Sequence, residues 1–250
     1  NLVSGVADIA FLRGHLYALE AGAGCSHGLL GTSNGVLRIH SDGSWKEIAD
    51  LSDFVSDNPA KHENPGDFEP DGTWYSMISA RGRLFAVEPN HGELDSISAD
   101  GTIRRVADIS ASQGHIVPTV VAYHDGDFYV GNLDTFPIIP GASVILKITP
   151  AGHVSVWASG FNTILGLDFD DEDNLYVLEN TVGAPGPTPG LGQVVRINEH
   201  GARTVVASGL FLPTGLTVGP DGNLYVSNYG FGLPPNGSGQ IVKITLHSED

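Results

Sequence analysis

The chain has little cysteine and little positive charge. It contains one cysteine among 250 residues, Cys25, so no disulfide can form within it and its stability has to come from packing and hydrogen bonding. Lysine and arginine number 12 against 29 aspartates and glutamates, which gives a formal net charge of −17. Because this charge repels phosphate backbones and anionic lipid headgroups, we expect no nucleic-acid partner and no attraction to membrane surfaces.

Long hydrophobic runs and helical periodicity are also missing. No apolar segment approaches the roughly 18 residues that a membrane-spanning helix needs, so we expect no membrane span. Charged residues make up only 16% of the chain, whereas glycine (33 residues) and proline (15 residues) are abundant. This composition is typical of many short strands joined by tight turns.

A five-residue strand pattern recurs five times. Each copy alternates apolar residues, carries an aromatic residue at its second position and ends in a carboxylate or an amide. The copies are Leu16–Glu20, Leu84–Glu88, Phe128–Asn132, Leu175–Glu179 and Leu224–Asn228. Their aromatic residues stand 68, 44, 47 and 49 residues apart. Since a period of about 45 residues is that of a four-stranded propeller blade, we predict an all-β protein, a single five-bladed β-propeller domain over residues 1–250 rather than a six-bladed one.

Each predicted blade follows one order. An inner strand comes first, as at 215–218, and a tight turn leads to the repeated strand; a third and a fourth strand follow, as at 193–197 and 203–209. The long first interval carries one insertion between blades, 51–73.

The two ends of the chain are predicted to complete one blade. The last repeat stops after its third strand, 240–246, and residues 1–5 match the end of a fourth strand such as 156–160. We predict that this N-terminal strand pairs in the last blade and closes the ring, because the alternative, an open stack of hairpins, leaves two unpaired sheet edges.

Long loops gather on one predicted face. The turns of the opposite face are short, as at Arg13-Gly14 and Arg81-Gly82, and we assign them no function. The long loops carry prolines and aromatic residues, so we predict a pocket at this loop face for a small-molecule or carbohydrate ligand. The alternative is that the prolines only stiffen exposed loops. The predicted substrate rim is Trp74, Tyr75, Phe136, Tyr229 and Phe231.

The last residues of the five repeats form a predicted polar ring about the axis. They are Glu20, Glu88, Asn132, Glu179 and Asn228. Three carboxylates facing one another must take up protons or bind a cation. Their oxygen ligands suit Ca²⁺ better than Mg²⁺, since calcium accepts a large irregular shell, and we predict a calcium site. The alternative is a channel filled by ordered water or by arginine side chains.

Two histidines near this ring are candidate catalytic bases. His91 follows the second repeat and His115 lies on a blade connection, and either could move a proton near neutral pH. The alternative for each is an ordinary surface or hydrogen-bonded histidine. The acidic run 168–174 lacks the glycine and the final glutamate of an EF-hand, so we interpret it as a solvated acidic turn.

Two stretches carry a family resemblance. Gly131-Asn132-Leu133, with Phe136-Pro137 shortly after it, and the turn and strand Gly219–Val226 resemble the ScyD/ScyE family of propeller proteins. The resemblance extends from residue 1 to about residue 246 and implies an exported protein, secreted or periplasmic, although the chain begins in a strand with no signal peptide. Members often carry paired cysteines in the first long loop, where this chain has only Cys25, and a glutamate at the place of Asn132.

A more distant similarity is to the gluconolactonase and paraoxonase propellers. It implies an axial calcium held by Glu, Asn and Asp, and hydrolysis of lactones or esters, although those propellers have six blades. Fold alone does not decide function.

Two functions follow as hypotheses. The first is a metal-assisted hydrolase or lyase, in which the cation polarises a carbonyl or activates water and His91 or His115 moves the proton. The second is a non-catalytic, exported binding module for a carbohydrate, peptide or other ligand, with a structural cation. We expect the protein to be a monomer in either case.

Overall fold

Two-residue turns and alternating apolar residues produce antiparallel hairpins throughout the chain. Leu12 pairs with His15 across the turn Arg13-Gly14, and Ala80 pairs with Arg83 across Arg81-Gly82. All four turn residues have positive φ, between 49° and 79°. This is the geometry of the tight hairpin turns whose twist matches that of the flanking strands.

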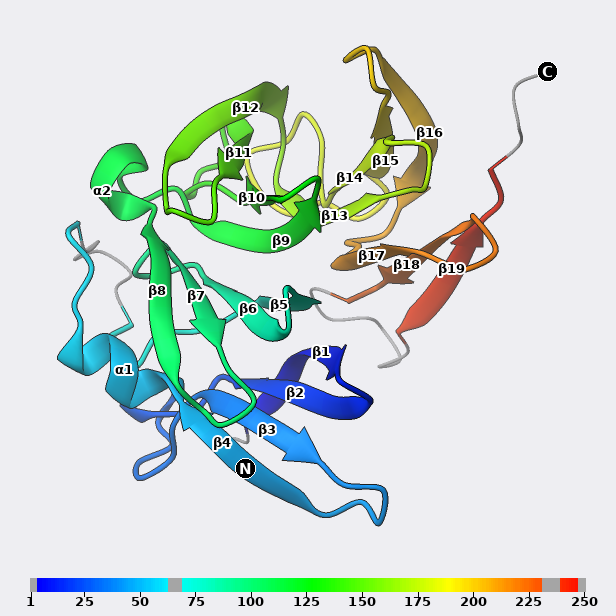
Figure 1. Cartoon of the computed structure of the whole chain (residues 1–250). Helices are drawn as coiled ribbons and strands as arrows, with labels where there is room; N and C mark the ends of the chain where they lie inside the picture. The colour runs from blue at the N-terminus through cyan, green and yellow to red at the C-terminus, as the bar shows by residue number, and fades with distance from the viewer. Residues whose placement is uncertain (1–3, 63–68, 231–238, 247–250) are drawn as a thin grey trace. The chain divides into compact units, whose positions relative to one another are not determined.

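The computed structural model describes residues 4–62, 69–230 and 239–246. Its strands form five antiparallel sheets, each a blade, and the fold is the predicted five-bladed β-propeller (Figure 1). Four sheets have four strands, and the described part of the last has three. No helix within these ranges is long and apolar enough to cross a lipid bilayer.

The strands follow the predicted order within each blade. Blade 1 contains β1 (Gly5–Leu12), β2 (His15–Ala21), β3 (Gly35–Ile39) and β4 (Trp45–Asp50). Blade 2 contains β5 (Ser76–Ala80), β6 (Arg83–Glu88), β7 (Glu93–Ile97) and β8 (Ile103–Asp108). Blade 3 contains β9 (Pro118–His124), β10 (Asp127–Asn132), β11 (Ser143–Ile148) and β12 (Val154–Phe161). Blade 4 contains β13 (Ile164–Phe169), β14 (Leu175–Glu179), β15 (Gly192–Ile197) and β16 (Arg203–Leu210). Blade 5 contains β17 (Gly215–Val218), β18 (Leu224–Asn228) and β19 (Gln240–Ile244).

In the ranges that the structure describes, short helices occupy three connections. They are η1 (Cys25–His27), α1 (Leu51–Asp57) and α2 (Ser110–Gln113). The helix α1 lies in the predicted insertion, and sequence periodicity did not reveal it because it is only seven residues long. It begins at an N-cap, Asp50, whose side chain accepts the N–H of Asp53 at 2.9 Å.

The predicted closing strand cannot be followed to its partner. Residues 1–3 lie outside the described residues, and Gly5 already belongs to β1 of blade 1. The pairing of residues 1–5 in the last blade therefore stays a prediction.

The chain divides into two compact units, which we describe separately. Unit 1 is Asn1–Phe128 with Lys147–Ser155, and unit 2 is Tyr129–Leu146 with Val156–Asp250. The core of unit 1 includes the fully buried Tyr17, Leu19, Trp74 and Leu84. In unit 2, Tyr176 and Leu178 pack against Leu224 and Val226 of the next blade. Burial of each such large side chain contributes about 1.5–3 kcal/mol, so the repeated strands hold neighbouring blades together.

Candidate functional site

The side chain that ends each repeated strand binds within its own blade. The fullest case is Glu179, whose Oε1 accepts the backbone N–H of Asn162 at 2.6 Å and its side-chain amide at 2.9 Å. The other oxygen, Oε2, accepts the amide of Gln193 at 2.6 Å. Because residue 162 lies between β12 and β13, this carboxylate fastens the segment that enters blade 4 to the second and third strands of that blade.

Three other blades repeat this entry contact. Glu88 accepts the N–H of Thr73 at 2.8 Å, Asn228 accepts the N–H of Phe211 at 2.7 Å, and Glu20 accepts the hydroxyl of Ser4. Asn132 differs, since its Oδ1 accepts the N–H of Val144 at the start of the third strand, at 2.7 Å. Sequence reasoning identified these residues but not this role; the signal was the recurring separation of 15 to 17 residues between acceptor and donor.

These contacts bear on the predicted calcium site. Both carboxylate oxygens of Glu88 and of Glu179 already accept hydrogen bonds from the protein. In the part of the chain that the structure describes, no group of three or more His, Cys, Asp or Glu side chains is arranged to hold a metal ion. Calcium at the five repeat ends thus stays a prediction from the sequence, and we derive no chemical step through a metal.

Blade 2 contains three buried acids, Glu88, Glu93 and Asp95. Burial raises the pKa of Glu88 to about 8 and that of Glu93 to about 7. Burial, and then the neighbouring Glu93, raise the pKa of Asp95 well above its usual range. The Arg105 guanidinium donates to Glu93 and to the carbonyl oxygen of Asn58, just after α1. Burial thus favours the protonated form of these acids, and the contacts of Arg105 tie the insertion to blade 2.

The predicted catalytic histidines lie in different surroundings. His91 is only 2% exposed, its backbone N–H donates to Glu88, and its Nε2 lies 3.1 Å from the carbonyl oxygen of Glu69. His115 is partly buried, two residues after α2. The burial of His91 leaves a substrate no route to its ring in this conformation.

The predicted rim residues also separate. Trp74 is fully buried and donates its indole N–H to Asp95 at 3.2 Å, so it presents no surface to a ligand. Tyr75 is partly exposed, and burial raises its pKa to about 12. Phe136 is 58% exposed and Tyr229 is partly exposed, whereas Phe231 lies outside the described residues. Of this set, Phe136 is the side chain most open to a partner.

The long loops of unit 2 expose further apolar side chains besides Phe136. We call the loops 133–142 and 181–191, with residues 211 and 229, the proline-loop face. It exposes Ile139 (65%), Leu191 (40%) and Phe211 (40%) besides Phe136. Proline occupies positions 137, 140, 185, 187 and 189 of these loops.

Contacts between loops hold the proline-loop face in shape. The N–H of Ile138 donates to the carbonyl oxygen of Pro185 at 2.8 Å and so joins the two long loops. The N–H of Gly141 donates to the side chain of Asn162 at 3.0 Å. The rings of Phe211 and Tyr229 pack in a tilted contact, with centroids 5.1 Å apart. The exposed apolar groups thus stand on a fixed backbone.

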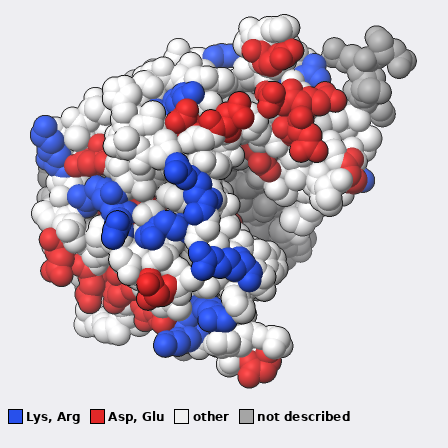
Figure 2. All heavy atoms as spheres, viewed as in Figure 1, with Lys and Arg blue, Asp and Glu red and all other residues white. Residues whose placement is uncertain are grey.

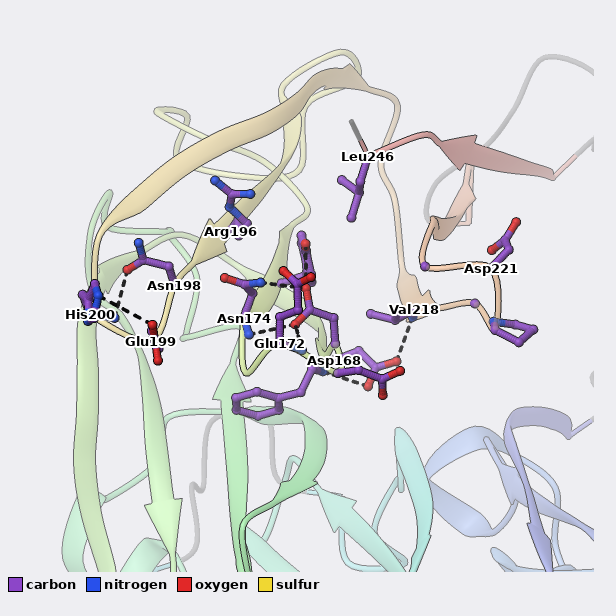
Figure 3. Close-up of a pocket in the computed structure, with 17 residues that line it drawn as sticks. Asp168, Glu172, Asn174, Arg196, Asn198, Glu199, His200, Val218, Asp221 and Leu246 are labelled. Atoms are coloured by element: carbon purple, nitrogen blue, oxygen red, sulfur yellow. Dashed lines mark hydrogen bonds and ion pairs between the residues drawn. The ribbon is translucent and has the colours of Figure 1, made fainter. Parts of the chain in front are cut away.

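Unit 2 also has a hollow on its short-turn face, with a volume of about 1200 Å³ (Figure 3). Its lining comes from the β13–β14, β15–β16 and β17–β18 turns, and Asp168, Glu172, Glu199 and Asp221 are among the carboxylates drawn there. Burial raises the pKa of Asp168, and the ammonium group of Lys243 lowers the pKa of Asp221. We predicted no pocket on this face, because short turns gave no signal for one.

The acidic run at this hollow folds as an acidic turn. Asp170 Oδ1 accepts the N–H groups of Glu172 and Asn174, both at 2.9 Å. Its Oδ2 accepts the amide of Asn174 and the hydroxyl of Tyr176. Four donors therefore satisfy this carboxylate and hold the turn.

Comparisons with known proteins show the fold. No family model matches the chain, and no curated protein matches its sequence. The solved structure of a nidogen–laminin complex is similar with a TM-score of 0.61 at 15% identity, over 90% of this chain and 73% of that one. A virginiamycin B lyase from Staphylococcus aureus is similar with a TM-score of 0.55 at 16% identity, over 96% and 70%. A putative gluconolactonase gives a TM-score of 0.56 at 14% identity, over 97% and 80%.

Proposed function

We propose that this protein is a binding module and that the proline-loop face is its ligand surface. The observation that carries the proposal is a group of exposed apolar side chains on loops whose backbone is fixed by contacts between loops. Exposed apolar patches mark interaction sites more often than chance. A backbone that is already ordered loses little conformational entropy on binding, which favours affinity.

The chemistry of the face indicates the ligand. Phe136 and Ile139 are exposed on one loop, and the ring of Phe211 packs against that of Tyr229 in a tilted contact. Such groups gain free energy by burying apolar surface, so the ligand should present an apolar or aromatic group, as a peptide segment of a protein does. A nidogen–laminin complex uses the same fold, which supports the idea that this architecture can serve protein binding.

Peptide selection tests this proposal. Displayed random peptides are selected on the wild-type protein, and their affinity is measured by fluorescence polarisation for Phe136→Ala and Ile139→Ala. We expect each substitution to weaken binding about tenfold, as truncation of an interface anchor does. Val205→Ala is the matched control, since Val205 is an equally exposed apolar residue (53%) on β16 of the same unit. Peptides that bind all three variants like the wild type would contradict the proposal.

A metal-assisted hydrolase or lyase is the second candidate. The fold of the virginiamycin B lyase and of the putative gluconolactonase supports it, while the buried ring of His91 favours the binding module. A panel of lactones and esters, assayed with added calcium, tests it directly. Turnover that is lost in His115→Ala would favour the enzyme over the binding module. We also retain export, on the ScyD/ScyE resemblance, as part of both candidates.

Calcium is tested separately by calorimetry. If the five repeat ends hold an ion, protein stripped with a chelator should bind one Ca²⁺ and bind Mg²⁺ more weakly. Binding should weaken strongly in a Glu20→Gln/Glu179→Gln variant, whereas Glu199→Gln on an exposed turn should leave it unchanged. The absence of heat from the wild-type protein would refute the predicted ion.

A further inference from the structure

Arginine is unevenly distributed in this acidic protein. Nine of the 12 lysines and arginines lie in unit 1 and three in unit 2. The space-filling view shows basic side chains gathered over one side of unit 1 (Figure 2). Three of the nine cationic residues of unit 1 lie at two hairpin turns, β1–β2 and β5–β6, and they are Arg13, Arg81 and Arg83.

The two turns bring these arginines together. A terminal nitrogen of Arg13, Nη2, lies 3.4 Å from the place that a Cβ on Gly82 would occupy. Gly82 stands between Arg81 and Arg83 in the chain, so the guanidinium of Arg13 lies against the turn that carries the other two. Arg13 and Arg81 are exposed and Arg83 is partly buried.

Among the described residues, no carboxylate pairs with these three arginines. In the described residues, none of them forms an ion pair within 4.0 Å. Arg83 donates to two neutral acceptors, the carbonyl oxygens of Thr102 at 3.0 Å and Ser96 at 3.4 Å, which fix its guanidinium and leave its charge in place. Asp100, in the β7–β8 turn that also carries Thr102, accepts from Ser98 and Thr102 instead. Positive charges that meet at neighbouring turns without a carboxylate partner attract an anion.

The backbone adds an independent observation. Arg13 (φ 52°) and Arg81 (φ 49°) both occupy the left-handed region at the first position of their turns. This position favours asparagine, aspartate and glycine, and it disfavours a long side chain such as arginine. In blade 3 the equivalent residue is Asp125 (φ 48°), the kind of residue that the turn prefers. Two blades thus carry arginine where local stability favours another residue, which points to a function of the side chain.

We propose that Arg13, Arg81 and Arg83 form a binding site for a phosphate or sulfate group. The arginine fork matches the oxygens of such a group with paired, charge-assisted hydrogen bonds. A single group also suits the protein as a whole, since the net charge of −17 repels a polymer with dense negative charge. The group could arrive as a free ion or be carried by a larger molecule such as a sugar.

The decisive variant is Arg13→Asn/Arg81→Asn. Asparagine suits both turns, so this variant should melt at or above the wild-type temperature, and lost binding cannot then be attributed to lost folding. Inorganic phosphate and inorganic sulfate are titrated at low salt, and the backbone amides of Gly14 and Gly82 are followed by NMR. We expect both amides to shift in the wild type, and the affinity of the variant to fall about tenfold or more. Lys61→Ala, which removes an exposed cation of the same unit, should bind like the wild type.

The same titration identifies the source of the group. Tighter binding of glucose 6-phosphate or glucose 6-sulfate than of the inorganic ions would assign the site to a sugar-borne group, and equal binding would assign it to the free ion. If the amide signals of Gly14 and Gly82 in the wild-type protein do not shift during the titration, the proposal is overturned. An Asn variant with unchanged affinity, or a Lys61→Ala variant as weak as the Asn variant, would overturn it as well.

Discussion

At the scale of single residues, the chain places acids where water does not reach them. Glu88 and Glu93 are fully buried, and burial raises the pKa of each. Glu88 accepts the N–H of Thr73, and Glu93 accepts the guanidinium of Arg105. The sequence indicated that crowded carboxylates must take up protons or bind a cation. It could not indicate Glu93 and Asp95, which lie outside the repeat and are brought beside Trp74 and Arg105 only by folding.

The raised pKa of Glu88 makes stability depend on pH. A folded-state pKa of about 8 against an ordinary value of 4.5 means that the folded protein binds the proton more tightly. The resulting stabilisation is complete below pH 4.5 and is lost as the pH rises through about 8, which amounts to about 4–5 kcal/mol for this one group. We expect urea unfolding of the wild type to show stability that falls from pH 5 to pH 9.

Glu88→Gln should flatten this dependence while lowering stability at pH 5, because an amide presents N–H to one of the two backbone donors. Asp125→Asn is the control, since its side chain is 85% exposed in the same unit and its loss should leave the slope unchanged. A wild-type stability that rises between pH 5 and pH 9 would contradict the assignment.

At the scale of elements, the hydrogen bond between a strand end and a blade entry is the recurring device. It uses a carboxylate in blades 1, 2 and 4 and an amide in blade 5. Each acceptor satisfies a backbone or side-chain donor where the chain crosses between blades and has no sheet partner. The requirement is for an oxygen acceptor, which explains why glutamate and asparagine alternate at one repeat position.

Glu179 gives a graded test of this device. Glu179→Ala leaves the donors of Asn162 and Gln193 unsatisfied in a buried site, and we expect a loss of about 3–5 kcal/mol in the free energy of unfolding. Glu179→Gln keeps one acceptor, and Gln193 can turn its amide to match, so about 1 kcal/mol should be lost. Glu199→Ala, with a side chain 65% exposed, should cost little. Denaturant titration measures all three, and an alanine variant at residue 179 as stable as that at residue 199 would refute the device.

At the scale of the whole molecule, the sequence determined the architecture. The fivefold recurrence of an alternating strand with a fixed ending encodes both strand and period, and these are local properties that survive without any knowledge of contacts. The five blades, their strand order and the tight turns all followed from it. The helix α1 did not, because seven residues are too few for a periodicity to appear and its capping aspartate ends a strand.

Tertiary structure decided what each polar and aromatic residue does. Gln193, Asp95 and Gly82, the partners of Glu179, Trp74 and Arg13, are 14, 21 and 69 residues away in the chain, and the repeat period does not specify these contacts. Trp74, predicted as a rim residue, is buried in the core. Arg13, on the β1–β2 hairpin, lies against the β5–β6 hairpin, and no pattern in the sequence indicates this contact. The period of a repeat can be found from the sequence alone. The environment of a side chain depends on neighbours that only folding brings close, and these neighbours determine its chemistry.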